Sequence, residues 1–344
     1  MTASARMTAS ARMTASARGA AAAAPSPIGA PQPLAIDGVP RLRAIGLTRR
    51  FKERTALDGL SFDVAPGEIF GLLGPNGAGK TTAFRLLAGL IPPHAGTLAL
   101  DGQPTDGGDA RYRARLGVVF QEPSLDLKLT GRENLRLGAA LYGLPRALAA
   151  QRIDAALALM ELGDRADEAT AKYSGGMRRR IEIARVLLHE PSLLLLDEPG
   201  RGVDPEALRR IWDQLAALVA ARGLSVIVTT HQPEEAERCH RIAILDGGKL
   251  TALGTPDELR GRVAGDVIRV RGDRPEELRD TIAARLNLPG RIVDGDVVIE
   301  APRGHEVVPR IAELFATGRI ASLATSRPTL ADVFAKLTGR GLAS

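Results

Sequence analysis

Short apolar runs alternate along the chain with stretches in which apolar residues recur every three or four positions. The runs at residues 69–73, 116–120 and 193–196 contain only apolar residues and glycine, as in strands buried on both faces. Residues 225–230 and 241–245 are further predicted strands. Helical spacing is found at residues 81–90, within 130–162 and at 181–188. This order predicts an α/β fold with a mainly parallel sheet and helices on both faces.

Two regions depart from that pattern. Near residue 40, alternating segments at 42–47 and 61–64, with a turn at Asp58-Gly59, predict a small antiparallel sheet. After residue 260 the predicted order is strand 267–270, helix 275–286, hairpin 291–300, helix 305–315 and strand 320–324. This βαββαβ order predicts a small ferredoxin-like α+β module. We therefore expect one large domain over residues 39–260 and a module over residues 261–344.

The first 38 residues differ from the rest in composition. They repeat Met-Thr-Ala-Ser-Ala-Arg three times and continue into an alanine- and proline-rich stretch. Few large apolar groups are present to offset the entropy of ordering, so we predict a disordered, low-complexity tail. A translation start placed too far upstream is the alternative.

Composition narrows the class of protein. No stretch of the 344 residues approaches the roughly 18 apolar residues of a membrane span, so we expect no transmembrane helix. The single cysteine, Cys239, cannot form an intrachain disulfide, which fits a reducing cytoplasm. The net charge is +6, and three of the basic residues are in the tail (Arg6, Arg12 and Arg18). The other arginines are dispersed, so no nucleic-acid partner is expected.

A glycine-rich segment follows the apolar run at 69–73. It reads Gly74, Pro75, Asn76, Gly77, Ala78, Gly79, Lys80 and Thr81, and it matches the phosphate-binding pattern G-x-x-x-x-G-K-[ST]. Its glycines let backbone N–H groups surround the β- and γ-phosphates, to which Lys80 adds a charge. Thr81 is a predicted Mg²⁺ ligand, and Thr82 is a further predicted nucleotide contact. The segment therefore predicts a site for ATP and Mg²⁺.

Two carboxylates end the apolar run at 193–196. Phosphoryl transfer needs one group to hold the Mg²⁺ and another to polarise the attacking water. We assign the first role to Asp197 and the second to Glu198. An apolar strand ending in Asp-Glu is common in other contexts, so the assignment depends on the phosphate loop that precedes it.

The segment Tyr173-Ser174-Gly175-Gly176-Met177, before Arg178–Arg180, resembles the signature of the ABC (ATP-binding cassette) family. A Ser-Gly-Gly turn at the start of a helix can bind an anion through its hydroxyl and backbone N–H groups. Further matches follow in the family's order. They are Phe51 for the aromatic that stacks on adenine, Gln121 for the Q-loop, Asp204 for the D-loop and His231 for the switch histidine.

The resemblance implies the cassette fold, with a helical subdomain over about residues 122–178. It implies an ATPase in which Glu198, His231 and Gln121 serve catalysis, and Thr81, Gln121 and Asp197 hold Mg²⁺. Because ATP in this family lies between the P-loop of one subunit and the signature of another, it also implies a homodimer or a paired ATPase subunit. In that pair, Ser174, Gly175, Gly176 and Asp204 act across the interface.

Two segments indicate which subfamily of the ABC family the chain resembles. The phrase Tyr-Ser-Gly-Gly-Met-Arg-Arg-Arg and the C-terminal Leu330-Ala-Asp-Val-Phe334 are similar to bacterial daunorubicin-resistance-type and nodulation-type exporter ATPases. This resemblance implies outward transport through a separate polytopic permease, with the chain on the cytoplasmic face of the membrane. Gly200-Arg201 departs from the Thr-containing segment that is common before the D-loop, which puts communication around Asp204 in doubt.

Two other functions are compatible with an ABC cassette. One is a non-transport ATPase of the ribosome-associated or DNA-repair type. The first of these usually has two cassettes in a chain, and the second has a long coiled coil between P-loop and signature, where this sequence has only about 90 residues without sustained heptads. The other is a nucleotide-sensing regulator, which no sequence feature favours.

Overall fold

The computed structural model describes residues 38–315 and 319–342. All of the predicted tail except Gly38 lies outside the described residues. Within the described ranges, no helix has the length and apolar character that crossing a bilayer requires.

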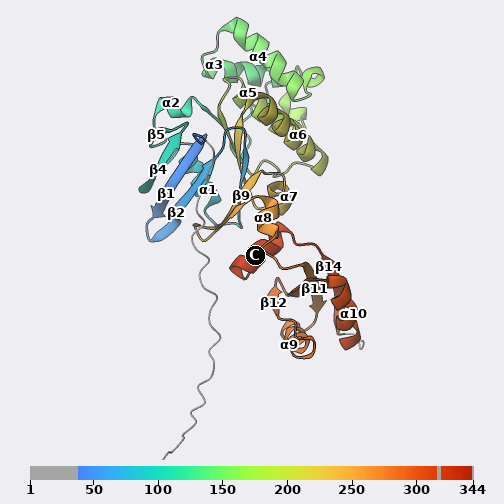
Figure 1. Ribbon diagram of the computed structural model, residues 1–344. Helices are drawn as coiled ribbons and strands as arrows, with labels where there is room; N and C mark the ends of the chain where they lie inside the picture. Colours follow the sequence, from blue (N-terminus) through green and yellow to red (C-terminus); the bar gives the residue numbers. More distant parts are fainter. Residues whose placement is uncertain (1–37, 316–318, 343–344) are drawn as a thin grey trace, which may run out of the picture. The chain divides into compact units, whose positions relative to one another are not determined.

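A six-stranded sheet forms the centre of the large domain (Figure 1). Its strands follow in the order β10-β9-β3-β8-β7-β6, and all neighbours are parallel except the antiparallel pair β9–β10. The bounds are β3 (Ile69–Leu73), β6 (Leu116–Val119), β7 (Leu193–Asp197), β8 (Ser225–Thr230), β9 (Arg241–Asp246) and β10 (Lys249–Gly254). The predicted mainly parallel sheet is therefore confirmed, and β3 and β8 have the predicted bounds.

Side chains from the two faces of this sheet enter two separate apolar cores. From β7, Leu193 and Leu195 join one core, whereas Leu194 and Leu196 join the other. The first core includes helix α1 (Lys80–Leu87) and the antiparallel sheet, and the second includes α5 (Gly175–Leu187) and α6 (Pro205–Arg222). This division follows from the strand period of two and explains why the run at residues 193–196 is apolar at every position.

The second sheet is antiparallel, with the order β2-β1-β4-β5. Its strands are β1 (Leu42–Phe51), β2 (Arg54–Val64), β4 (Ala95–Leu100) and β5 (Gln103–Thr105). The predicted turn at Asp58-Gly59 is wrong: β2 runs through both residues, and the chain reverses at Lys52-Glu53 instead. Around this point the register shifts between Leu47↔Leu60 and Arg49↔Leu57, so Gly59, with φ +69°, marks an irregularity within the strand pair.

Several helices pack together after β6 (Figure 1). Helix α2 (Ala110–Arg113) precedes that strand, and α3 (Gly131–Leu141) and α4 (Arg146–Leu159) follow it within the predicted helix-rich stretch. Two 3₁₀ turns, Gly163–Arg165 and Thr170–Lys172, lead to α5. Helix α7 (Pro233–Ala236) follows β8, and α8 (Pro256–Arg260) follows β10.

The C-terminal residues form a four-stranded antiparallel sheet with the order β12-β13-β11-β14. The elements are β11 (Asp266–Gly272), α9 (Pro275–Leu286), β12 (Gly290–Val293), β13 (Asp296–Ala301), α10 (Gly304–Leu314) and β14 (Ile320–Ser326). This is the βαββαβ order expected from the sequence. Helix α11 (Leu330–Thr338) then packs on α7 and α8, and its Leu330, Val333 and Phe334 join the apolar core that contains α5 and α6. The boundary at residues 260/261 stays a prediction.

Candidate nucleotide-binding site

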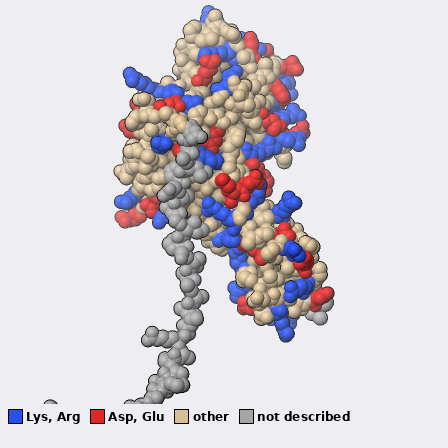
Figure 2. Space-filling model, viewed as in Figure 1, with Lys and Arg blue, Asp and Glu red and all other residues tan. Residues whose placement is uncertain are grey.

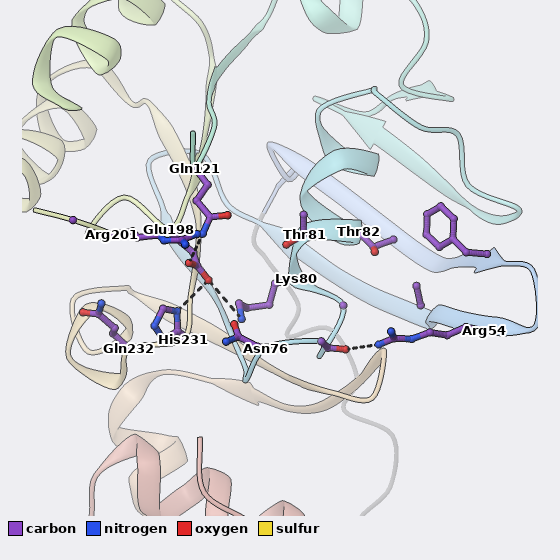
Figure 3. Close-up of a pocket in the computed structure, with 15 residues that line it drawn as sticks. Arg54, Asn76, Lys80, Thr81, Thr82, Gln121, Glu198, Arg201, His231 and Gln232 are labelled. Atoms are coloured by element: carbon purple, nitrogen blue, oxygen red, sulfur yellow. Dashed lines mark hydrogen bonds and ion pairs between the residues drawn. The ribbon is translucent and has the colours of Figure 1, made fainter. Parts of the chain in front are cut away.

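The parallel strands β3, β8, β7 and β6 are neighbours in that order, and their carboxyl ends meet at one edge of the sheet. The glycine-rich loop follows β3, Gln121 lies two residues beyond β6, Asp197 ends β7 and His231 follows β8. In sheets of this type, ligands bind beyond the carboxyl ends of the strands. A cleft of about 790 Å³ is found there (Figure 3).

The residues that line this cleft come from the two sheets and from the loops after the strands. They are Phe51, Arg54, Ala56, Asn76, Gly77, Gly79, Lys80, Thr81, Thr82, Gln121, Glu198, Arg201, Gly202, His231 and Gln232. Most of the predicted nucleotide contacts are therefore brought together. Gly74, Pro75 and Ala78 belong to the loop but are not among the lining residues.

The glycine-rich loop ends at the first residue of α1, which is Lys80. Gly79 before it has φ +105°, and a Cβ there would lie 2.7 Å from the carbonyl oxygen of Ala56, so only glycine fits. The buried Lys80 Nζ donates to the carbonyl oxygens of Gly74 (2.6 Å) and Pro75 (3.0 Å). Burial lowers the pKa of Lys80, and the carboxylates of Glu198 and Asp197 oppose that shift. The loop thus holds its one cation at the floor of the cleft.

Glu198 is the centre of a polar cluster in the cleft. Its Oε2 accepts a hydrogen bond from Gln121 Nε2 (2.9 Å), its Oε1 lies 3.1 Å from His231 Nδ1, and Lys80 Nζ lies 3.9 Å away. Figure 3 shows these side chains converging from different loops. Burial acts to raise the pKa of Glu198, but the hydrogen bonds from Gln121 and His231 and the charges outweigh it, so the pKa is lowered. The carboxylate is therefore ionised at neutral pH.

Asp197, the residue before Glu198, is more deeply buried than Glu198. Its Oδ1 accepts a hydrogen bond from the Thr229 hydroxyl, because these residues are paired across β7 and β8. Burial raises the pKa of Asp197, against the effects of Thr229 and Lys80. Among the described residues, no cluster of three or more His, Cys, Asp or Glu side chains forms a metal cage. A Mg²⁺ site fits these residues, because Mg²⁺ is usually bound by one or two carboxylates together with phosphate oxygens.

At the far side of the cleft, the end of β1 presents an aromatic ring. Phe51 is 45% exposed, and the Arg49 guanidinium lies 5.1 Å from its ring centroid. Arg54 begins β2, and its Nη2 donates to the carbonyl oxygen of Gly77 at 3.2 Å. No sequence pattern singled out Arg54, because only the chain reversal at Lys52-Glu53 places it next to the phosphate loop.

The predicted signature adjoins the cleft without lining it, since a Cβ on Gly175 would lie 2.5 Å from the carbonyl oxygen of the lining residue Gly202. The described residues that line the cleft do not include Ser174, Gly175 or Gly176. Ser174 caps α5 by accepting a hydrogen bond from the Met177 N–H (3.2 Å), and it is exposed. A Cβ on Gly176 would lie 2.4 Å from Ala207 Cβ. The glycine is therefore also required for packing against α6.

The predicted D-loop residue has a structural role as well. Asp204 caps α6 by accepting a hydrogen bond from the Ala207 N–H at 2.9 Å. Before it, Arg201 and Gly202 line the cleft. A Cβ on Gly200 would lie only 2.0 Å from Glu235 Oε1, so a side chain at this position would have to displace the buried Glu235 carboxyl.

Three comparisons bear on this site. Residues 57–201 match the family model described as ABC transporter. The chain is 42% identical over 297 residues to the "Nod factor export ATP-binding protein I" of Paraburkholderia xenovorans, covering 85% of this chain and 95% of that protein. It also resembles the structure of cbiO1 from Clostridium perfringens, described as part of the ABC transporter complex cbiONQ, with 27% identity, a TM-score of 0.61, and coverage of 72% of this chain and 96% of that one.

A further structural relative has been solved as a dimer. It is an ATP-binding cassette in a post-hydrolysis state bound to ADP and Pi, with 26% identity, a TM-score of 0.56, and coverage of 62% of this chain and 98% of that one. None of these similarities supports a non-transport function. The phosphate loop, the carboxylates after β7 and the similarity over most of the chain agree, and the chain belongs to the ABC transporter family as a nucleotide-binding ATPase subunit.

Proposed function

We propose that this subunit powers an ABC exporter, and that ATP draws two copies, or one copy and a paired ATPase subunit, together on a separate permease. The observation that carries the proposal is the division of the site. One cleft collects Lys80, Glu198, Gln121 and His231, whereas the exposed Ser174 lies outside it. A second subunit would supply the missing signature, as in the dimeric arrangement that the related ADP-bound cassette is described as having.

Binding of ATP uses groups from both sheets. Phe51 is exposed at the edge of the cleft and is available to stack on the adenine. The backbone N–H groups of residues 76–81 and the N-terminus of α1 face the phosphates, and Lys80 supplies the compensating charge. The adjacent hydroxyls of Thr81 and Thr82 line the same cleft.

Hydrolysis uses the polar cluster around Glu198. An ionised carboxylate can accept a proton from the attacking water, and the lowered pKa of Glu198 keeps it in that form. Gln121 and His231 fix its two oxygens, which leaves the carboxylate in one orientation. Thr81, Gln121 and Asp197 would hold Mg²⁺, which neutralises charge on the phosphates. His231 would also contact the γ-phosphate.

The signature would act on the nucleotide of the partner subunit. Ser174 and the N–H groups of Gly175 and Gly176 are at the start of the 13-residue helix α5, where the helix dipole favours an anion. A γ-phosphate placed between Lys80 of one copy and Ser174 of the other would bridge the two subunits. Its loss on hydrolysis would remove that bridge, and Asp204 beside the signature would sense the change.

Export is the direction that the relatives favour, because the printed name of the Paraburkholderia xenovorans protein is that of a Nod factor export protein. We place the subunit on the cytoplasmic face of the membrane, held there by the permease. The transported molecule would contact the permease rather than this chain.

The dimer is tested with Glu198→Gln, which keeps the shape of the side chain and removes its charge. We expect this variant to bind ATP without hydrolysing it and to elute as a dimer in size exclusion with ATP and Mg²⁺. Lys80→Ala is the matched control, which should bind ATP poorly and stay monomeric. A Glu198→Gln protein that is folded and saturated with ATP yet remains monomeric would refute the proposed closure.

The transport role is tested by co-purification of the tagged full-length chain. Recovery of a polytopic membrane protein supports it. Recovery of ribosomes or DNA instead would overturn it.

A further inference from the structure

Helix α5 makes several contacts with the nucleotide site through one buried arginine. Arg179 is only 5% exposed and lies in the second turn of that helix. Its guanidinium donates to the carbonyl oxygens of Phe120 (2.7 Å), Asp197 (3.3 Å), Glu198 (3.3 Å) and Pro199 (3.3 Å). One side chain therefore joins the residue before Gln121 to the segment that contains both carboxylates.

The same helix also holds the far end of the Gln121 segment. Glu182, one turn after Arg179 and ion-paired with it at 3.2 Å, accepts hydrogen bonds from the Ser124 N–H (2.6 Å) and hydroxyl (3.2 Å). Arg185, a further turn along, donates to the Ser124 carbonyl oxygen at 2.9 Å. The segment 120–124 is thus fixed to α5 at both ends, with Gln121 between them.

The backbone of Glu198 needs such support. Its φ is +44°, a left-handed conformation that costs a residue with a side chain about 1–3 kcal/mol unless its surroundings impose it. The Glu198 N–H donates to the carbonyl oxygen (3.0 Å) and hydroxyl (3.1 Å) of Thr229, and Arg179 holds the carbonyl on the other side. The direction of the carboxylate depends on this pair of contacts.

We propose that Arg179 is a positioning residue for ATP hydrolysis. From helix α5 it holds the backbone of Glu198 and the backbone of the Gln121 segment, so that the side chains of Glu198 and Gln121 meet in the cleft. The proposal rests on the catalytic roles proposed above for Glu198 and Gln121. Arg179 does not line the cleft, so it acts through these two residues and not on the nucleotide.

Arg179→Gln in the full-length chain tests the proposal, because glutamine cannot reach four carbonyl groups at once. We expect kcat to fall about 10- to 100-fold, since displacing reacting groups by about 1 Å has effects of that size, while KM changes less than about threefold. Arg180→Gln is the matched control: Arg180 is also buried on α5 but donates to Met160 O (2.7 Å), away from the cleft. Its kcat should stay near that of the wild type even though its thermal stability falls.

A double-mutant cycle separates positioning from a general loss of stability. In a Gln121→Ala background, Arg179→Gln should lower the residual kcat by a smaller factor than in the wild type, because the part of its effect that acts through Gln121 is already lost. An equal fall in both backgrounds, or a kcat equal to that of Arg180→Gln, would overturn the proposal. If Arg179→Gln does not fold, Arg179→Lys is measured in its place, with the same cycle and the same criteria.

Failure of the proposed function would give a different set of ATPase activities from failure of the positioning role alone. If Glu198→Gln retained wild-type ATPase activity, the assigned catalytic roles would be wrong whatever Arg179 does. If Glu198→Gln is inactive and the Arg179 cycle is additive, only the positioning role fails.

Discussion

Glu235 gives a prediction about pH that can be worked out from the structure. Its side chain is 3% exposed beside Gly200, and its Oε2 has no hydrogen-bond partner among the described residues. Burial raises the pKa of Glu235 to about 7, with a further contribution from the charge of Glu198, against the opposing effects of Thr230 and Arg179. The folded protein therefore keeps this carboxyl protonated at pH values where the unfolded chain has lost the proton.

The sign of the effect follows from proton linkage. Between the ordinary glutamate pKa of 4.5 and about 7, the folded state binds more protons than the unfolded state. The free energy of unfolding should therefore fall as pH rises through this window, by about 3 kcal/mol in all, and level off above it. Glu235→Gln keeps a neutral side chain of the same shape, so it removes this component.

The measurement is urea unfolding of the nucleotide-free wild type and of Glu235→Gln at a series of pH values from about 5 to 8.5. Other groups titrate equally in both proteins, so the difference between the two free energies of unfolding isolates Glu235. We expect the variant to gain stability relative to the wild type as pH rises, with most of the change complete by about pH 7.5. A difference that stays constant over the whole range would refute the reasoning.

Two further predictions concern phenylalanine side chains, one exposed at the cleft and one buried in the core. Phe51→Ala should weaken ATP binding roughly 5- to 100-fold, which is the usual effect of losing one aromatic–base stack. The unfolding midpoint should not change, because Phe51 is 45% exposed. Titration with a fluorescent ATP analogue measures the affinity, and an unchanged affinity would show that Phe51 does not contact the nucleotide. Phe334→Ala should lower the free energy of unfolding by about 3–5 kcal/mol, because the ring is fully buried in the core shared with α5 and α6; a loss under about 1 kcal/mol would show that α11 adds little to that core.

Charged side chains of both signs are mixed on the face of the molecule that Figure 2 draws. Figure 2 shows Lys and Arg interspersed with Asp and Glu on the face in view, and the ion pairs of the described residues include several between neighbours on one helix, such as Arg210–Glu206. Exposed pairs of this kind contribute about 0–1 kcal/mol each.

The sequence alone determined the features that depend on local order. The period of two in β7, the glycines before Lys80 and the run of motifs from Phe51 to His231 are each encoded within short segments. They were therefore enough to predict the central sheet, the phosphate loop and the family. The turn at Asp58-Gly59 was predicted wrongly, because pairing with β1 outweighs the turn preference of those two residues.

Only the tertiary structure decided the contacts made between distant segments. Arg179 lies within a run of three arginines after the signature, yet its partners Phe120 and Glu198 are supplied by two other loops. Thr229 meets Asp197 because β7 and β8 are neighbours, and the pKa of Glu235 depends on burial that no local pattern reports. Hydrogen-bond geometry and desolvation depend on which segments the fold brings together, so a sequence can name the reacting groups without showing what holds them in place.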